Sequence, residues 1–504
     1  MSRTAFRPAT AALASLLAIA ASGAWAATGI VRVGAEIGVA PPVTGAGPPS
    51  VCTTPGGGFV VAHRRSDSGS ARIVVRRMSA GGAPLAPEIQ VSTYVGGDRR
   101  DPDVACTSDG GFAVVWTDLL PPEEDPDDAF REEILARAFD SSNQPASAPF
   151  TVNAFTTGNQ QTPAVCAQAD DSFAIVWLDR KRDELDARVV QAGGPAADGE
   201  LVAHGPRAFM APDVACAGGK FLAVWGDFPS TAVNDEVLAR AFTADGKPAG
   251  ASFVVNADPS GDQGYPSVCG APRDGFVVSW RDTSARRGSG TIKARHVTLG
   301  GAPAGAGFEV SPEGRNRADL ACGSAGGFVV VTRADMEGVE TLFAQAVDAE
   351  RELVGPEIVV ARLDGAHTLE APPIAGDGDG RFVVAWANAA GADAASVRAH
   401  FFEVGDPAGT TTTTPTLATT VPTTTSSTTT TTTPGNAECG DAAPNDPGLS
   451  VLDALVTLKT AVGTASCDPC TCDVDASGTV TVQDALRILS KSVGLSVALT
   501  CPAC

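Results

Sequence analysis

The chain has few of the side chains from which catalytic sites are usually built. Its 504 residues include two tyrosines and five histidines, and no spacing among them indicates a triad or a metal site. Positive charge is also scarce, because 36 Lys and Arg stand against 58 Asp and Glu and leave a net charge of -22. Nucleic-acid phosphates are repelled by such a charge, so we expect no nucleic-acid partner.

Long apolar runs are missing as well. No stretch after the N-terminal region could cross a bilayer, which needs about 18 or more apolar residues, so the sequence predicts no membrane span. At the N-terminus, Arg3 and Arg7 precede the apolar residues 11–21, and Ala24 and Ala26 provide the small side chains that a signal peptidase reads. We expect residues 1–26 to be a signal peptide and the protein to be secreted or at the cell surface, extracellular or periplasmic.

One motif is abundant instead, and it repeats. Variants of Phe-Ala-Val-Val-Trp begin at Phe59, Phe112, Phe173, Phe221, Phe276, Phe328 and Phe382. Each copy belongs to a unit of four strand-like runs, which in the second unit are residues 103–106, 112–116, 134–139 and 150–153. A period near fifty residues with several strands per unit is typical of a propeller.

The order of the runs indicates a closed ring. A fourth-type run, residues 36–40, precedes the first unit, and the same run is missing after the third-type run near Ala399. A ring needs this offset if the first strand completes the last blade, because closure removes exposed sheet edges. Residues 29–407 are therefore predicted to form an all-β, seven-bladed propeller; tandem β-sandwiches are the weaker alternative.

Repeated positions are interpreted as scaffold. Tryptophan occupies one equivalent site as Trp116, Trp177, Trp225, Trp280 and Trp386. We expect these side chains to pack between blades, the aspartates two residues later (Asp118, Asp179, Asp227 and Asp282) to accept turn hydrogen bonds, and the arginines Arg137, Arg188, Arg240 and Arg295 to be structural. The Gly-Phe-x-Val-x-Trp and Ala-Arg-x-Phe-Asp phrases resemble a family of bacterial secreted repeats, which implies a propeller-like fold and little about function.

Two features of the repeat region are open to functional interpretation. The acidic residues 121–128 are expected to be a solvated surface loop, with a cation or a basic partner as the alternative. Six cysteines end the first strands at Cys52, Cys106, Cys166, Cys216, Cys269 and Cys322. We expect them to be buried apolar side chains, because neighbouring blades should hold them farther apart than the limit of about 7 Å between Cα atoms.

A threonine-rich segment follows the repeats. Of the 24 residues from Thr410 to Thr433, 17 are threonine, so residues 408–435 are predicted to be an extended linker. Residues 436–504 then contain two similar segments that begin at Asp453 and Asp484, with apolar residues at helical spacing. They predict a small α-helical domain.

The loop before the second helix has the pattern of a calcium site. Oxygen-bearing residues stand at loop positions 1, 3, 5, 7, 9 and 12, with glycine at position 6. The predicted ligands are Asp473, Asp475, Ser477, the carbonyl of Thr479, Thr481 and Asp484. The loop-helix pairs resemble a type I dockerin, an EF-hand-like module, and this resemblance implies calcium as the cofactor and a cohesin-like partner for residues 436–504.

Six further cysteines lie in the tail. Cys467 with Cys470 and Cys501 with Cys504 have zinc-site spacing, but in an exported chain the six favour three disulfides. For the whole protein we expect a non-catalytic binding or scaffold role, with the propeller engaging a protein or glycan and the tail attaching through calcium. A propeller polysaccharide hydrolase or lyase and a structural cell-surface protein are alternatives; convergence of carboxylates and arginine at one channel mouth would favour the enzyme.

Overall fold

The chain divides into two compact units, Met1–Thr411 and Thr412–Cys504. The computed structural model describes residues 29–44, 47–67, 70–93, 98–120, 131–195, 201–204, 210–227, 234–271, 275–284, 290–324, 326–363, 371–389 and 394–405 in the first unit. In the second unit it describes residues 457, 472–474, 480–481, 484–485, 487–488 and 491. The expected signal peptide, linker and acidic loop 121–128 lie outside these residues, as do most residues of the expected α-helical tail.

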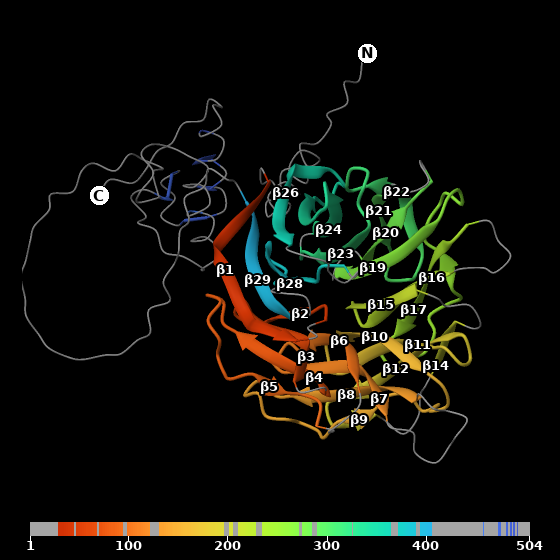
Figure 1. The fold of residues 1–504 in the computed structure, drawn as a ribbon. Coiled ribbons are helices and arrows are strands. Elements are labelled where there is room, and N and C mark those ends of the chain that lie inside the picture. Colours follow the sequence, from red (N-terminus) through yellow and green to blue (C-terminus); the bar gives the residue numbers. More distant parts are fainter. Residues whose placement is uncertain are drawn as a thin grey trace, which may run out of the picture. The chain divides into compact units, whose positions relative to one another are not determined.

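The described part of the first unit is a seven-bladed β-propeller, as predicted (Figure 1). Blade 1 contains β2 (Ser50–Thr54), β3 (Gly58–Asp67), β4 (Ser70–Met78) and β5 (Ile89–Gln90), and blade 2 contains β6 (Arg99–Cys106), β7 (Phe112–Leu120), β8 (Arg131–Phe139) and β9 (Phe150–Thr151). Blade 3 contains β10 (Gln160–Ala167), β11 (Phe173–Asp179), β12 (Glu184–Gln191), β13 (Gly194–Pro195) and β14 (Leu201–His204). Blade 4 contains β15 (Met210–Ala217), β16 (Lys220–Asp227), β17 (Glu236–Thr243) and β18 (Phe253–Val254).

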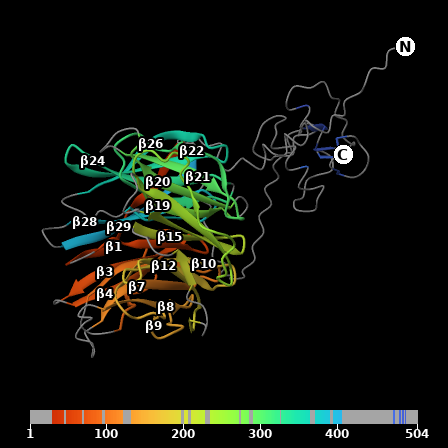
Figure 2. The ribbon, with the colours of Figure 1, turned by 90° about the vertical axis from the view of Figure 1, so that its right-hand side faces the viewer.

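The remaining blades follow the same order. Blade 5 contains β19 (Gln263–Ala271), β20 (Gly275–Asp282), β21 (Thr291–Val297) and β22 (Pro303–Glu309), and blade 6 contains β23 (Arg317–Cys322), β24 (Phe328–Met336), β25 (Val339–Val347) and β26 (Leu353–Leu363). Blade 7 joins β27 (Ile374–Gly376), β28 (Arg381–Ala389) and β29 (Ala394–Gly405) to β1 (Gly29–Thr44). Figure 2 shows these strands from the side.

The first strand closes the ring. β1 pairs antiparallel with β29, with Ile37 opposite Ala399 and Gly29 opposite Gly405, and the two strands lie side by side in Figure 1. One further pair, Thr44 with Ser66, connects β1 to β3 of blade 1. Segments from the two ends of the repeat region therefore form one blade, as the strand order predicts.

Apolar side chains fill the space between neighbouring blades. Seven buried clusters each combine residues of two adjacent blades, so every seam of the ring has its own core. Trp116, Trp177, Trp225 and Trp280 are at most 1% exposed and Trp386 is 4% exposed. Their packing role is confirmed, and large aromatic side chains at these seams contribute much of the buried apolar area.

The repeated arginines connect blades through hydrogen bonds. Arg137, Arg188 and Arg295 each donate from Nη1 to a backbone carbonyl just after the outer strand of the preceding blade. The acceptors are the carbonyls of Val91, Val152 and Val255, at 3.0, 2.6 and 2.6 Å. These side chains are scaffold, as expected.

The aspartates after the tryptophans serve two purposes. Asp179 accepts turn hydrogen bonds from the amides of Lys181 and Arg182, and Asp282 accepts one from the amide of Ser284. Asp118 differs, because its Oδ2 accepts hydrogen bonds from Trp116 Nε1 and from the buried Arg99. A turn role was expected for all of them, and the local sequence gives no sign that Asp118 binds the indole instead.

The expectation for the repeat cysteines was wrong. Disulfides join Cys52 to Cys106, Cys166 to Cys216 and Cys269 to Cys322, with Cα atoms 5.5–5.6 Å apart. Inner strands converge toward the ring axis, so equivalent positions of adjacent blades come within bridging distance. The disulfides connect blades 1–2, 3–4 and 5–6, while Gly376 holds the equivalent position of blade 7. Such bonds are typical of proteins that fold in an oxidising compartment.

Candidate active site in the central channel

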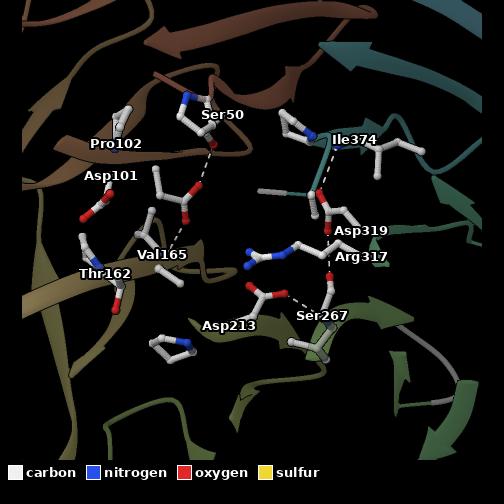
Figure 3. A pocket seen from close by; sticks show the side chains of 18 of the residues that line it. Ser50, Asp101, Pro102, Thr162, Val165, Asp213, Ser267, Arg317, Asp319 and Ile374 are labelled. Carbon is white, nitrogen blue, oxygen red and sulfur yellow. Dashed lines mark hydrogen bonds between the residues drawn. The ribbon is translucent and has the colours of Figure 1, made fainter. Parts of the chain in front are cut away.

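A cavity of about 550 Å³ lies where the inner strands of the blades meet. Its walls come from residues at the beginning of these strands, and Arg180, in the turn after β11, also lines it. Asp101, Asp103, Asp213 and Asp319 line the cavity together with Arg317, Tyr265 and several prolines. Figure 3 shows carboxylates from different blades around one open space. Acidic, basic and aromatic side chains thus converge at the centre of the ring.

The inner strands alternate between two sequences around the ring. Blades 2, 4 and 6 place Asp103, Asp213 and Asp319 three residues before cysteine. Blades 1, 3 and 5 instead read Pro-Ser-Val-Cys, Pro-Ala-Val-Cys and Pro-Ser-Val-Cys, with Ser50, Ala164 and Ser267 two residues before cysteine. This alternation was visible in the sequence, but treating all repeats as equivalent concealed it.

Each of the three aspartates links its blade to the next one. Oδ2 of Asp103 accepts a hydrogen bond from the amide of Val165 at 2.8 Å, and Oδ2 of Asp213 accepts one from the amide of Val268 at 2.8 Å. Oδ2 of Asp319 accepts the equivalent hydrogen bond from the amide of Ile374 in blade 7. These bonds cross seams 2–3, 4–5 and 6–7, which are the seams without a disulfide that follow blades 2, 4 and 6.

Serine hydroxyls complete two of the three carboxylate sites. Ser50 Oγ donates to Asp103 at 2.6 Å, and Ser267 Oγ donates to Asp319 at 2.7 Å. At the third site Ala164 stands where the hydroxyl would be. The hydrogen bonds described for Asp213 come only from the backbone amides of Val214 and Val268. Asp213 is therefore the carboxyl group whose surroundings differ most from the other two.

Burial raises the pKa of all three carboxyl groups, because desolvation disfavours the charged form. The pKa of Asp213 rises to about 7, through desolvation first and then the negative charge of Asp319. The pKa of Asp319 rises to about 6, again mainly through desolvation, while the hydrogen bond from Ser267 opposes the shift. Asp103 shifts in the same direction. These carboxyl groups are therefore protonated more readily near neutral pH than ordinary aspartates.

Three cavity residues hold an uncommon backbone conformation. Asp101, Thr162 and Tyr265 have φ angles of 52°, 50° and 53°, and each precedes a proline at a β-bulge of its inner strand. Non-glycine residues seldom adopt positive φ, and each such residue costs about 1–3 kcal/mol. Residues held this way cluster at functional sites, where the bulge directs a side chain.

Arg317 brings a positive charge to the cavity wall, and the neutral Tyr265 lies beside it. The guanidinium carbon of Arg317 lies 4.1 Å from the centre of the Tyr265 ring, a distance typical of a cation–π contact. In Figure 3 the Arg317 side chain extends into the middle of the opening, on the side of Asp213. Arg180 is exposed, and its Nε donates to Gln161.

The predicted calcium ligands lie in the second unit and are only partly described. Asp475, Ser477 and Thr479 are outside the described residues, whereas Asp473 and Asp484 are fully buried. The amide and the hydroxyl of Thr481 both donate to Asp484 Oδ2 at 2.8 Å. Cys472 is in a disulfide, as expected for an exported chain.

The described residues lack two further features. They include no group of three or more His, Cys, Asp or Glu side chains placed to hold a metal ion. Among these residues, no helix has the length and apolar character needed to cross a membrane.

Comparison with known proteins identifies the fold and no family. No protein-family description matches the chain, and no curated protein matches it. Among solved structures, an ulvan lyase from a new family of polysaccharide lyase, bound to a saccharide of GlcA and Rha3S, has a TM-score of 0.50 at 10% identity over 74% of this chain and 97% of that one.

Two other solved structures are less similar in shape. A protein of unknown function from Dyadobacter fermentans has a TM-score of 0.47 at 14% identity, over 75% of this chain and 99% of that one. An α-L-arabinofuranosidase from Fusarium graminearum has a TM-score of 0.40 at 12% identity, over 64% and 99%.

The expectation of a non-catalytic binding or scaffold role was wrong. The polysaccharide lyase with a TM-score of 0.50 shares the fold of this chain, and at 10% identity that likeness concerns the fold alone. Within the chain, carboxylates, arginine and tyrosine converge on one cavity, the arrangement that favours the enzyme alternative. Sequence reasoning missed these residues because it assigned the repeat region to scaffold.

Proposed function

We propose that the propeller is an enzyme that cleaves glycosidic bonds of an extracellular polysaccharide. One observation carries the proposal: Asp213 and Asp319 line the same cavity of about 550 Å³, with pKa values raised to about 7 and about 6. Glycoside hydrolysis uses two carboxyl groups, one protonated and one ionised, whose surroundings separate their pKa values. A cavity of this volume accommodates a few sugar units.

The two carboxyl groups have distinguishable roles in this proposal. Asp213, with the higher pKa, donates its proton to the glycosidic oxygen as the bond from the anomeric carbon to that oxygen breaks. Asp319, ionised at the same pH, accepts a proton from the water whose oxygen bonds to the anomeric carbon. Arg317 and Tyr265 lie on the same wall and are placed to orient the sugar.

A substitution series tests this proposal. Reducing ends released from a panel of plant, algal and bacterial polysaccharides are measured for the wild type, Asp213→Asn and the control Asp245→Asn. Asp245 lies on the surface beside Lys247, so its substitution should leave cleavage unchanged, whereas Asp213→Asn should lower kcat about a hundredfold or more. Arg317→Gln serves as a second variant in case Asp213→Asn folds poorly. If the folded variants cleave as fast as the wild type, the proposal is wrong.

For the second unit we propose a calcium site formed by Asp473, Asp475, Ser477, Thr479, Thr481 and Asp484, in a dockerin-like module that attaches to a cohesin-like partner. Two observations support it: Asp473 and Asp484 are fully buried, and Asp484 Oδ1 accepts no hydrogen bond within the described residues. A buried carboxylate oxygen without a donor is costly unless a cation satisfies it.

Calorimetric titration of the full chain tests the calcium site. Calcium should bind with one high-affinity event, Asp473→Ala should remove it, and Asp377→Ala, a change in a propeller turn, should leave it intact. Binding that persists in Asp473→Ala would disprove the proposed ligand set.

A further inference from the structure

The charges of the cavity wall bear on which glycans it accepts. Four aspartates line the cavity, Asp101, Asp103, Asp213 and Asp319, against two arginines, Arg180 and Arg317. Even with Asp213 protonated, the remaining carboxylates outnumber the guanidinium groups. A wall of this composition attracts cations and repels anions, and low-dielectric walls focus that field at the mouth.

The placement of the charged side chains increases the excess of negative charge that faces the open space. Arg180 is exposed and its Nε is hydrogen-bonded to Gln161. Arg317 is stacked with Tyr265, so much of its face contacts an aromatic ring. The aspartates Asp103, Asp213 and Asp319, by contrast, come from the inner strands of three different blades and all line the cavity. Figure 3 shows Asp213 and Asp319 beside the open space.

The charge of the whole chain acts in the same direction. A net charge of -22 repels a polyanion before it reaches the cavity. Recognition of uronate or sulfate groups ordinarily needs arginines in bidentate contact with the anion. Two arginines line the cavity, and Figure 3 shows the Arg317 side chain extending into the opening.

We propose that the cavity takes neutral or amino-bearing glycans and excludes uronate and sulfated ones, so that the reaction is hydrolysis rather than elimination. This inference rests on the proposed glycan-cleaving function. Elimination breaks the glycosidic bond by removing a proton next to a uronate carboxyl group, and a neutral or amino sugar has no such group. Hydrolysis instead adds water across the bond and needs only the acid and base that the two aspartates provide.

Binding of three oligosaccharides of equal length tests the substrate class. The probes are a glucosamine oligomer, a cello-oligosaccharide and a galacturonate oligomer, titrated calorimetrically at low salt against the wild type, Asp319→Asn, Arg317→Gln and the control Asp245→Asn. The glucosamine oligomer or the cello-oligosaccharide should bind the wild type, and the galacturonate oligomer at least about tenfold more weakly. Asp319→Asn should weaken glucosamine binding about tenfold and leave cello-oligosaccharide binding nearly unchanged, because it removes one negative charge.

The outcomes separate this inference from the function on which it rests. Tighter binding of the galacturonate oligomer, lost in Arg317→Gln, overturns the substrate class. If that oligomer is also cleaved by the wild type and not by Asp213→Asn, the glycan-cleaving function survives and the inference alone falls. If none of the three probes binds, the inference falls; if the polysaccharide panel is not cleaved either, the function falls with it. Products with an unsaturated sugar, seen as new ultraviolet absorbance, overturn hydrolysis.

Discussion

The carboxylate of Asp319 accepts a hydrogen bond from the backbone amide of Ile374 at 3.1 Å, and this bond crosses from blade 6 to blade 7. Blade 7 has no disulfide to either neighbour, because Gly376 stands where the other blades have cysteine. On its other side, Thr53 Oγ1 donates to the carbonyl of Gly376 at 2.7 Å. Hydrogen bonds from the inner strands, together with the pair Thr44–Ser66 between β1 and β3, therefore hold this blade in the ring.

Ser267→Ala removes the hydroxyl that donates to Asp319. Ser267 is 5% exposed, so the carboxylate loses a buried donor, and we expect the free energy of unfolding to fall by about 1–2 kcal/mol. The pKa of Asp319 should also rise, because the hydrogen bond from Ser267 lowers it. Urea denaturation with the exposed Ser260→Ala as control measures the effect; equal stability of the two variants would count against this role.

Ala164→Ser is the reverse change at the equivalent position. It places a hydroxyl where Ser50 and Ser267 have theirs, next to Asp213, and a donor to a carboxylate lowers its pKa. We expect the acidic form of Asp213 to be lost at lower pH, so the alkaline limb of the pH–rate profile should move toward acid. The profile of Ala113→Ser, a change in the second strand of blade 2, gives the control. An unshifted alkaline limb would show that Asp213 is not the proton donor.

The raised pKa values predict how stability depends on pH. The carboxyl groups of Asp213 and Asp319 have pKa values of about 7 and about 6 in the folded chain, above the ordinary value of an aspartate. Between the ordinary aspartate pKa and these raised values, the folded chain binds more protons than the unfolded chain. The free energy of unfolding therefore falls as pH rises from about 4 to about 7. Denaturation at pH values across this window should show a loss on the order of several kcal/mol. Asp213→Asn should flatten the decline, and an unchanged slope would contradict the assignment.

Each inter-blade disulfide should contribute separately to stability. Cys269 and Cys322 enclose a sequence separation of 53 residues, and loops of this size predict about 2–4 kcal/mol for the bond. The double variant Cys269→Ala/Cys322→Ala should therefore unfold at lower denaturant concentration than the wild type under non-reducing conditions. Strong reductant also breaks this disulfide in the wild type, so the difference in stability between the two proteins should then become smaller. Detection of free thiols at these positions in the unreduced wild type would rule out the bond.

Closure by the first strand is testable at Val39. This side chain is fully buried in the cluster between blades 7 and 1, so Val39→Asp places an unpaired carboxyl group in an apolar seam and should cost several kcal/mol. Leu85→Asp, at a residue that is 59% exposed, is the matched control. A wild-type denaturation midpoint for Val39→Asp would mean that β1 contributes little to the closed ring.

The fold could be predicted from the sequence because its evidence is periodic. Seven copies of one strand motif set the number of blades, and the run at residues 36–40 showed which end completes the ring. The buried positions of the tryptophans followed from their repetition. Each of these features repeats a local pattern, and local patterns of strand and turn residues can be recognised without coordinates.

The site was harder to predict, because it depends on distances across the ring. More than a hundred residues separate Asp103 from Asp213, and again Asp213 from Asp319. Only the convergence of the inner strands brings these side chains to one cavity. The same convergence brings Cys52 to Cys106 within bonding distance, which the assumed spacing of blades excluded. A comparison of Ala164 with Ser50 and Ser267 could have singled out the surroundings of Asp213, since it requires only alignment of the repeats.

Pairs of blades joined by disulfides have a consequence for how the chain assembles. The three disulfides join six of the seven blades in pairs. The blade without a disulfide is blade 7, which is built from both ends of the repeat region. Each pair can lock using only residues already synthesised, in order from the amino end. The seventh blade must wait for the last repeat, so the circle is completed by the strand that was made first.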